Sequence, residues 1–381
     1  MSTFGELTAP KVEQIGPSGD GEFVYVDISS IDNQAKRIVD PKRLTPEAAP
    51  SRARQRLRKG DVLVSMTRPN LNAGAIVPSD LDGAIGSTGF HVLRANEDVE
   101  PHWLYYAVQS SSFVKAMCDL VQGALYPAVR PKDIREYAIS PPPLAKQREI
   151  VAELEKQFSR LDEAVTNLQR VKANLKRYER ATIQSLTNPE SFAPAVTGSI
   201  ADIAISLDNM RKPVNKTERA KRPGNIPYLG ANGPTGTIDK PLFDEELVLV
   251  VEDETFVGRT APFSYYFSGK CWVNNHTHVL RARPNVTLAK YLNLALSYYP
   301  FTPLTTGSTG RRKLTKAALM TAPICVPSLA DQTRVVAEVD RHLSIIREVE
   351  TEVEANLQRA QALRQATLAA AFGPNSKPYQ P

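Results

Sequence analysis

The sequence predicts an α+β protein in which two globular domains occur in tandem. Each domain is followed by a long helix, and the two helices pair as an antiparallel coiled coil. Three observations carry this prediction: the chain aligns with itself, two segments have a heptad pattern, and the segments between them alternate short β-type runs with turns. The length of 381 residues suits two domains of ordinary size with connecting segments.

The self-alignment is strongest at an offset of 185 residues. LAKQREIVAEL at 144–154 pairs without a gap with LADQTRVVAEV at 329–339, and the match continues along both heptad segments. Two heptad helices can resemble each other by chance, because they use the same few residue types. The repeat also extends upstream, however, since HVLRA occurs at 91–95 and again at 278–282. A duplication therefore explains the sequence better than chance does.

Prolines and a glycine mark the expected ends of both helices. The first helix begins after Pro141-Pro142-Pro143 and stops at Asn188-Pro189, and the second begins after Pro327-Ser328 and stops at Gly373-Pro374. Each helix is then 44 residues long, or about 66 Å at 1.5 Å per residue. The expected division of the chain is a first domain at 1–140, a central long helix at 141–188, a second domain at 189–326, a distal long helix at 327–373 and a polar tail at 374–381.

Apolar residues recur along each helix at alternating steps of three and four, which is the period of a coiled-coil seam. Lys172 interrupts the first seam and Glu350 interrupts the second. The apolar positions are Val151, Leu154, Phe158, Leu161, Val165, Leu168 and Leu175 in the first helix, and Val336, Val339, Leu343, Ile346, Val353 and Leu357 in the second. Because the helices are tethered in one chain, each is the nearest partner for the other. Antiparallel pairing would place the two domains at opposite ends of a rod.

The domains themselves have many turns. Short β-type runs such as EFVYVDI and ELVLVVE are combined with one helical stretch in each domain, at about 101–118 and 287–299. Their loops are rich in glycine and asparagine, which suit tight turns that bring backbone close to a ligand.

Charge is distributed unevenly along the chain. The net charge of +6 is a weak indication of a polyanionic partner. Residues 36–68 carry ten basic against three acidic residues, although such a run is often a solvated loop. Residues 1–143 hold 16 basic and 17 acidic residues, whereas 196–328 hold 16 and 10. The first domain is neutral as a whole, so any anionic partner must be held there by local patches.

Arginine, lysine, asparagine and glutamine on short loops match the donors and acceptors of base edges in a DNA groove. The candidates for DNA contact in the first domain are Arg68, Asn70, Asn72, Tyr126 and Arg130. In the second domain they are Asn209, Arg211, Lys212, Asn232, Arg259, Arg311, Arg312 and Lys313. Each of them alone is equally well a solvated surface side chain, so the prediction concerns the set.

The sequence holds no convincing catalytic motif. No glycine-rich cofactor loop with an N-P-P-Y-like element occurs, and the nearest match, Asn188-Pro-Glu190, lies at a helix end. The glycines before Lys313 have the wrong spacing for a P-loop. Glu252-Asp-Glu254 is equally well a solvated turn between strands, and residues placed as in His276-x-His278 are more often surface groups, so neither a nuclease centre nor a metal site is predicted.

The bulk composition excludes further classes. Cys118, Cys271 and Cys325 lie far apart and form no C-x-x-C pair, which excludes a disulfide framework and a thiolate zinc site and favours a reducing cytoplasm. No apolar run of about 18 residues occurs, so no membrane span is expected.

With its motifs Pro142-Pro-Leu-Ala-Lys-Gln147 and Pro327-Ser-Leu-Ala-Asp-Gln332, each at the start of a long helix, the chain resembles the specificity subunit of type I restriction-modification systems. The segment at 226–233 is also similar to segments of that family's target-recognition domains, and the first domain has no equivalent of it. The resemblance covers essentially the whole chain.

The resemblance implies a non-catalytic, cytoplasmic subunit that binds double-stranded DNA. Each target-recognition domain would read one half of a bipartite target, and the helix pair would set the spacer and dock two methyltransferase subunits. Motor-nuclease subunits would complete the restriction enzyme. No cofactor is expected in this chain, and S-adenosylmethionine, ATP and Mg²⁺ would belong to the partners. The alternative is a self-contained DNA-binding regulator that dimerises through its coiled coil.

Overall fold

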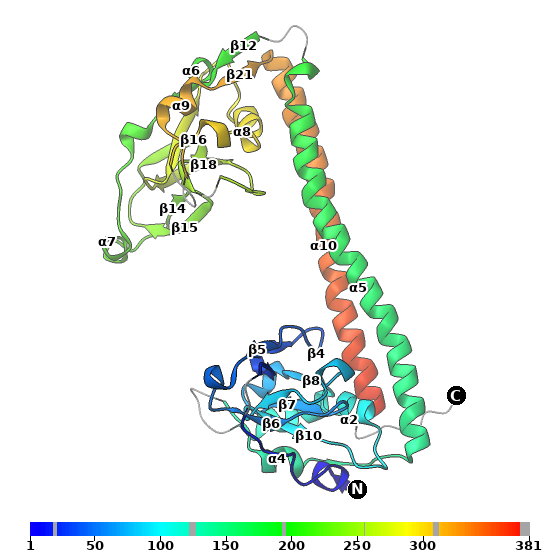
Figure 1. Cartoon of the computed structure of the whole chain (residues 1–381). Coiled ribbons are helices and arrows are strands. Elements are labelled where there is room, and N and C mark those ends of the chain that lie inside the picture. The colour runs from blue at the N-terminus through cyan, green and yellow to red at the C-terminus, as the bar shows by residue number, and fades with distance from the viewer. Residues whose placement is uncertain (18–20, 122–126, 193–195, 255, 308–311, 374–381) are drawn as a thin grey trace. The chain divides into compact units, whose positions relative to one another are not determined.

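The computed structural model describes residues 1–17, 21–121, 127–192, 196–254, 256–307 and 312–373. The polar tail predicted at 374–381 lies outside the described residues. The chain forms two compact units, one of Met1–Leu168 with Ala355–Pro381 and the other of Gln169–Glu354. Each unit therefore contains one globular domain and one part of each long helix (Figure 1).

The domain of the first unit is built from short strands and four short α-helices. Its strands are β1 Ser2–Thr3, β2 Phe23–Val26, β3 Ile31–Asp32, β4 Arg37–Ile38, β5 Lys42–Leu44, β6 Ala53–Arg56, β7 Val62–Ser65, β8 Gly74–Ile76, β9 Ile85–Ser87, β10 Phe90–Leu93 and β11 Ala138–Ile139. Its helices are α1 Phe4–Leu7, α2 Pro101–Ala107, α3 Ser111–Asp119 and α4 Pro131–Arg135, with 3-10 turns η1 Ile28–Ser30, η2 Pro46–Ala48, η3 Pro69–Leu71 and η4 Ser79–Leu81.

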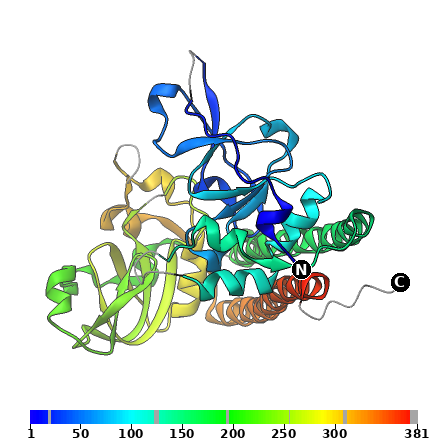
Figure 2. The same cartoon turned by 90° about the horizontal axis from the view of Figure 1, so that it is seen from below.

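Two small sheets form the frame of this domain, with strand orders β5-β2-β9-β6 and β10-β7-β8. Alternating side chains of these strands, among them Val26, Leu57 and Phe90, meet in a core between them. A second core joins Trp103 and Phe113 of the short helices to the long helices. β1 pairs with β11, so the beginning of the domain lies beside its end (Figure 2).

The domain of the second unit has one larger sheet. Its strands are β12 Val196–Ser199, β13 Ala204–Ser206, β14 Ile226–Gly230, β15 Gly233–Ile238, β16 Phe243–Val251, β17 Asp253–Glu254, β18 Ser264–Val273, β19 Thr277–Ala282, β20 Arg312–Lys313 and β21 Pro323–Val326. Its helices are α6 Ile200–Ile203, α7 Lys216–Ala220, α8 Ala289–Ser297 and α9 Lys316–Thr321, with 3-10 turns η5 Pro189–Ser191, η6 Asp208–Met210 and η7 Thr302–Leu304. The sheet has the order β13-β19-β16-β18-β14-β15, with β14 and β18 parallel. From Leu247 to Val251, β16 is buried on both faces: α6, α8 and α9 cover one face, and an apolar core around Leu247 and Leu249 covers the other.

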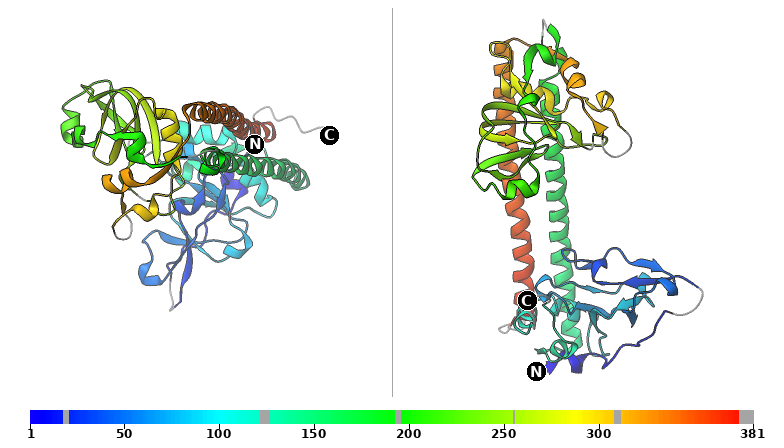
Figure 3. Two further views of the ribbon diagram at one scale, coloured as in Figure 1. Left: turned by 90° about the horizontal axis from the view of Figure 1, so that it is seen from above. Right: turned by 90° about the vertical axis from the view of Figure 1, so that its left-hand side faces the viewer.

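The two predicted long helices are α5 Leu144–Leu186, of 43 residues, and α10 Leu329–Phe372, of 44 residues. They pack together as an antiparallel pair, which confirms the predicted fold class (Figure 3). In the second unit, Lys172 Nζ lies 2.7 Å from Glu354 Oε1 and Tyr178 Oη lies 2.9 Å from His342 Nδ1. The later residue of α5 thus contacts the earlier residue of α10, as it must when the two helices run in opposite directions.

The seam departs from the predicted pattern near the domains. Val151, Leu154 and Phe158 are buried in the core of the first domain, because the beginning of α5 packs on its own domain as well as on α10. At the beginning of α10, Val335 is more deeply buried than the predicted Val336 for the same reason. Lys172, which interrupts the apolar pattern, pairs with Glu354 instead.

Candidate nucleic-acid interface

Three of the predicted DNA-contact residues of the first domain lie on one strained loop between β7 and β8. Arg68 has a φ of 49° and Asn72 a φ of 44°, a left-handed conformation that non-glycine residues seldom adopt. The side chains of Arg68 and Asn70 are exposed. The Asn72 amide instead donates a hydrogen bond to the Val108 carbonyl at 3.2 Å, so it helps to hold the loop.

Tertiary contacts maintain this conformation. Lys36 Nζ donates hydrogen bonds to the carbonyls of Asn72 at 2.6 Å and Leu71 at 3.3 Å. Burial, reinforced by the charge of Arg364, lowers the pKa of Lys36 to about 8. Strain that is held by surrounding contacts is a feature of binding loops. Sequence reasoning included Lys36 only in the basic run, because no local pattern shows that it holds a loop more than 30 residues away.

The segment that leads into α4 lies beside this loop. The Arg68 N–H donates to the Pro127 carbonyl and the Val129 N–H donates to the Met66 carbonyl, both at 2.8 Å. Arg130 is exposed, and its guanidinium is oriented by two hydrogen bonds to Asp133. A cavity of about 310 Å³ adjoins Arg68 and Pro127. The structure therefore places the segment that carries Arg130 beside the loop that carries Arg68 and Asn70, while Tyr126 lies outside the described residues.

In the second domain, Asn232 and Arg259 lie side by side. Arg259 Nη2 donates to Asn232 Oδ1 at 2.7 Å, and the same guanidinium donates to the Pro262 carbonyl. Asn232 is exposed at the turn between β14 and β15. This turn belongs to the 226–233 segment that was singled out in the sequence.

Arg211 lies in a largely buried cluster of charges. Its guanidinium donates to Glu252 Oε2 at 2.5 Å and to the Thr277 carbonyl at 2.8 Å. Burial raises the pKa of Glu252, but the hydrogen bond from Arg211 and other positive charges outweigh it and hold that pKa below its usual value. Arg211 thus holds η6 against the sheet. Its neighbours Asn209 and Lys212 are exposed to solvent.

The same cluster corrects two expectations from the sequence. His278 is not a surface group: it is 1% exposed, and its ring nitrogens lie 2.6 Å from Asp208 Oδ2 and 2.8 Å from the Leu314 carbonyl. Glu252 does not belong to a solvated turn, because it is 7% exposed and pairs with Arg211 and Lys313. The sequence missed this cluster because its members come from separate segments.

The basic run at 311–313 is divided in the fold. The Arg312 guanidinium donates to the hydroxyl and the carbonyl of Thr305, at 2.7 Å and 2.9 Å, so this side chain is engaged within the domain. Lys313 is exposed and pairs with Glu252. Arg311 lies outside the described residues. DNA contact by any member of the predicted set stays a prediction.

The glutamine of the repeated L-A-x-Q motif has a role that the sequence did not reveal. Gln147 Oε1 accepts the Glu100 N–H at 2.9 Å, and Gln332 Oε1 accepts the Leu288 N–H at 2.8 Å. Both side chains are buried, and both accept from the residue that precedes the short helix of their domain, α2 or α8. The repeated motif thus anchors each long helix to its own domain.

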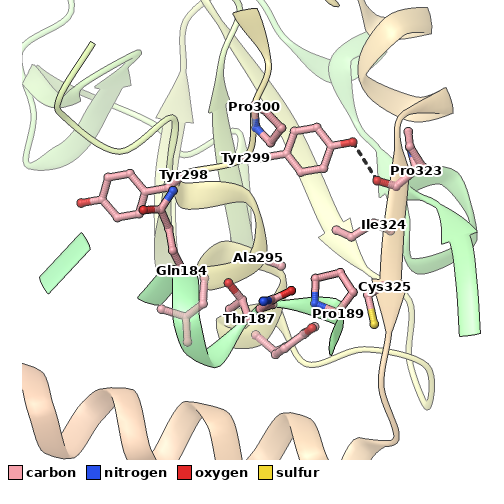
Figure 4. Close-up of a pocket in the computed structure, with 13 residues that line it drawn as sticks. Gln184, Thr187, Pro189, Ala295, Tyr298, Tyr299, Pro300, Pro323, Ile324 and Cys325 are labelled. Atoms are coloured by element: carbon pink, nitrogen blue, oxygen red, sulfur yellow. Dashed lines mark hydrogen bonds between the residues drawn. The ribbon is translucent and has the colours of Figure 1, made fainter. Parts of the chain in front are cut away.

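A cavity of about 290 Å³ lies in the second unit between the end of α5 and α8 (Figure 4). Tyr291, Tyr298, Tyr299, Pro300 and Pro323 give it an apolar wall, and the Tyr299 hydroxyl donates to the Pro323 carbonyl at 2.7 Å. None of its lining residues is charged, so it is unsuited to phosphate. Among the residues described by the structure, no group of three or more His, Cys, Asp or Glu side chains is placed to hold a metal ion, and no helix is long and apolar enough to cross a membrane.

Known proteins are similar to this chain in both sequence and fold. The family described as the type I restriction modification DNA specificity domain matches residues 13–176 and 195–359. A type I restriction enzyme specificity subunit of Haemophilus influenzae is 35% identical over 142 residues, which are 36% of this chain and about a third, 35%, of that protein.

Two solved structures match almost the full length. One, described as showing the basis of complex assembly and conformational transition of the type I R-M system, has a TM-score of 0.74 at 28% identity and covers 98% of this chain and 97% of that one. The HsdS subunit from Thermoanaerobacter tengcongensis has a TM-score of 0.55 at 26% identity, with 98% and 96% covered. The chain therefore belongs to the type I restriction-modification DNA specificity family, whose members are non-catalytic DNA-recognition subunits, and carries two copies of its domain.

Proposed function

We propose that each of the two domains reads one half of a bipartite DNA target. The observation that carries this proposal is the occurrence of two specificity domains in one chain, each joined through a buried glutamine to its own long helix. The domains differ in their loops, as two different half-sites require.

In the first domain, the reading surface consists of the β7–β8 loop and the segment at 127–130. Arginine recognises guanine and asparagine recognises adenine through paired hydrogen bonds. Arg68 and Asn70 offer these groups from a loop whose backbone is already held by Lys36 and Asn72, so little conformational entropy is lost on binding. In the second domain, Asn232 and Arg259 offer the same two groups, already oriented by their mutual hydrogen bond.

The helix pair has a separate task, which is to set the number of unread base pairs and to dock the partners. These are two methyltransferase subunits, with motor-nuclease subunits added for restriction. The bound S-adenosylmethionine, ATP and Mg²⁺ belong to those subunits, and the complex acts on double-stranded DNA in the cytoplasm. The resemblance to subunits of type I systems and the solved structure of an assembled system support this division of labour.

The test is co-expression of the chain with the neighbouring methyltransferase, followed by sequencing of methylated adenines. Wild type should methylate a bipartite sequence. The double substitution Arg68→Ala with Asn70→Ala should relax or abolish recognition of one half-site and leave the other half intact. A matched control, Asp119→Ala on the exposed end of α3, should change neither half. Binding of a single site without any methyltransferase would favour the self-contained regulator, and loss of both halves in the loop variant would contradict separate reading.

A further inference from the structure

The basic run of the first domain has a regular arrangement that the prediction of DNA contacts did not use. From position 52 to position 58, every second residue is an exposed arginine: Arg52, Arg54, Arg56 and Arg58. The residues between them, Ala53, Gln55 and Leu57, are buried. This alternation follows from the period of two in an extended strand, and the residues lie on and around β6 at the end of its sheet (Figure 1).

The backbone that carries these arginines is held on both sides. β6 pairs with β9 along one edge, and the Ile15 N–H donates to the Arg54 carbonyl at 2.7 Å along the other. The buried Gln55 amide donates to the carbonyls of Ser87 and Phe90, at 2.7 Å and 3.0 Å. The arginines therefore extend from a fixed support.

Among the residues that the structure describes, little negative charge compensates them. Arg56 lies 3.9 Å from Glu13, and both side chains are about half exposed. The Arg54 Nε donates to the Ser51 carbonyl at 3.0 Å, and no carboxylate among the described residues pairs with this guanidinium. Within the described part of the chain, the guanidinium groups of Arg52 and Arg58 have no hydrogen bond or ion pair. By contrast, the nearby Arg94 forms a bidentate ion pair with the buried Asp61, which is typical of an arginine that stabilises a fold.

We propose that Arg52, Arg54, Arg56 and Arg58, the arginine ladder, bind phosphates of the DNA backbone. Like charges on one strand repel each other, so the ladder does not serve the stability of the domain. A fully extended chain rises about 3.3 Å per residue, so the ladder spans at most about 20 Å. Duplex DNA carries one charge per about 1.7 Å, or about twelve phosphates over that length. The ladder also supplies the local positive patch that a domain of neutral net charge needs.

This inference rests on the proposed function but concerns a different property, which is affinity without base preference. Phosphate contacts position a protein on DNA and are sensitive to salt, whereas base contacts determine the sequence that is read. The two roles can therefore be separated by experiment.

The experiment measures binding of the full chain, co-expressed with the neighbouring methyltransferase, to two labelled duplexes over a series of KCl concentrations. One duplex carries the mapped methylation target and the other carries the same bases in scrambled order. Arg52→Gln with Arg58→Gln should lower the slope of log affinity against log salt by about 1.8. It should weaken binding to both duplexes by roughly 30-fold at 0.15 M salt. The matched control is Lys115→Gln with Lys132→Gln, which removes the same charge from α3 and α4 and should leave the slope unchanged.

Fold and function are controlled separately. The glutamine variant should melt no lower than wild type, since it loses no hydrogen bond of the protein. If it melts lower, the double variant Arg52→Lys with Arg58→Lys separates a loss of charge from a loss of fold. This variant keeps both positive charges and should keep the wild-type slope. An unchanged slope in the glutamine variant, a loss confined to the target duplex, or a reduced slope in the lysine variant would overturn the ladder. Failure of wild type to prefer the target duplex would instead overturn the proposed function.

Discussion

Gln332→Ala should destabilise the second unit far more than an ordinary substitution on a helix surface. The Gln332 side chain is 0% exposed and makes four hydrogen bonds. Its Oε1 accepts from the Leu288 N–H and the Thr287 hydroxyl, and its Nε2 donates to the carbonyls of Val286 and Pro327. Alanine removes all four bonds, each with a net contribution of about 0.5–1.5 kcal/mol, so the loss should be at least about 3 kcal/mol altogether.

A loss of this size corresponds to a fall in melting temperature of about 6–12 °C for a unit of this length. Differential scanning calorimetry of the full chain measures it. Gln169→Ala is the matched control, because Gln169 is an exposed glutamine on α5 in the same unit and its replacement should cost less than about 0.5 kcal/mol. Gln147→Ala should also destabilise the first unit, by a somewhat smaller amount, since its amide makes three of the four equivalent bonds there. Equal melting temperatures for Gln332→Ala and Gln169→Ala would refute the anchoring role of the repeated glutamine.

Three further predictions concern other parts of the chain. Inserting four residues of helix after Asn174 adds about 6 Å and should lengthen the unread spacer by one or two base pairs at 3.4 Å each. Both half-sites should stay unchanged in the methylation map, and an altered half-site would rule out a ruler. The pKa of Lys36 is lowered to about 8, so the folded state binds fewer protons than the unfolded state between about pH 8 and 10.5. Wild type should therefore gain stability relative to Lys36→Met as pH rises through that window. Urea unfolding at pH 7 and pH 9.5 measures the difference, and equal differences at the two values would disprove it. Glu252→Gln removes the main counter-charge of Arg211 and should cost about 3 kcal/mol, whereas Asp244→Asn at the exposed beginning of β16 should cost less than about 0.5 kcal/mol in the same denaturant titration.

The long helices and the repeat were predictable because their signals are local. Prolines before Leu144 and Leu329 and the heptad spacing of apolar residues limit where a helix begins and which side it buries. The antiparallel pairing followed from the tether between the helices. Val335 was missed because its burial depends on the domain that packs against α10, and a heptad pattern carries no information about that domain.

The candidate interface was predictable only in part. The residue types and the glycine- and asparagine-rich segments indicated that Arg68, Asn70 and Asn232 lie on loops, since the residues that favour a turn lie within a few positions of one another. The same reasoning could not separate these exposed residues from Arg211 and Arg312, which have equally suitable side chains but are held inside the domain. Burial and ion pairing depend on residues that are tens of positions away.

The sequence by itself determined the duplication, the two long helices, the mixed α and β domains and the family. These follow from periodicity, from the repeated motif and from the order of segments along the chain. Tertiary structure alone decided which charges are available to a partner. Arg211 lies among carboxylates that neutralise it, whereas Arg52 and Arg58, on either side of β6, have no counter-charges in the part of the chain that the structure describes. The physical reason is that the environment of a charge depends on the groups that folding brings around it, whatever their distance in sequence.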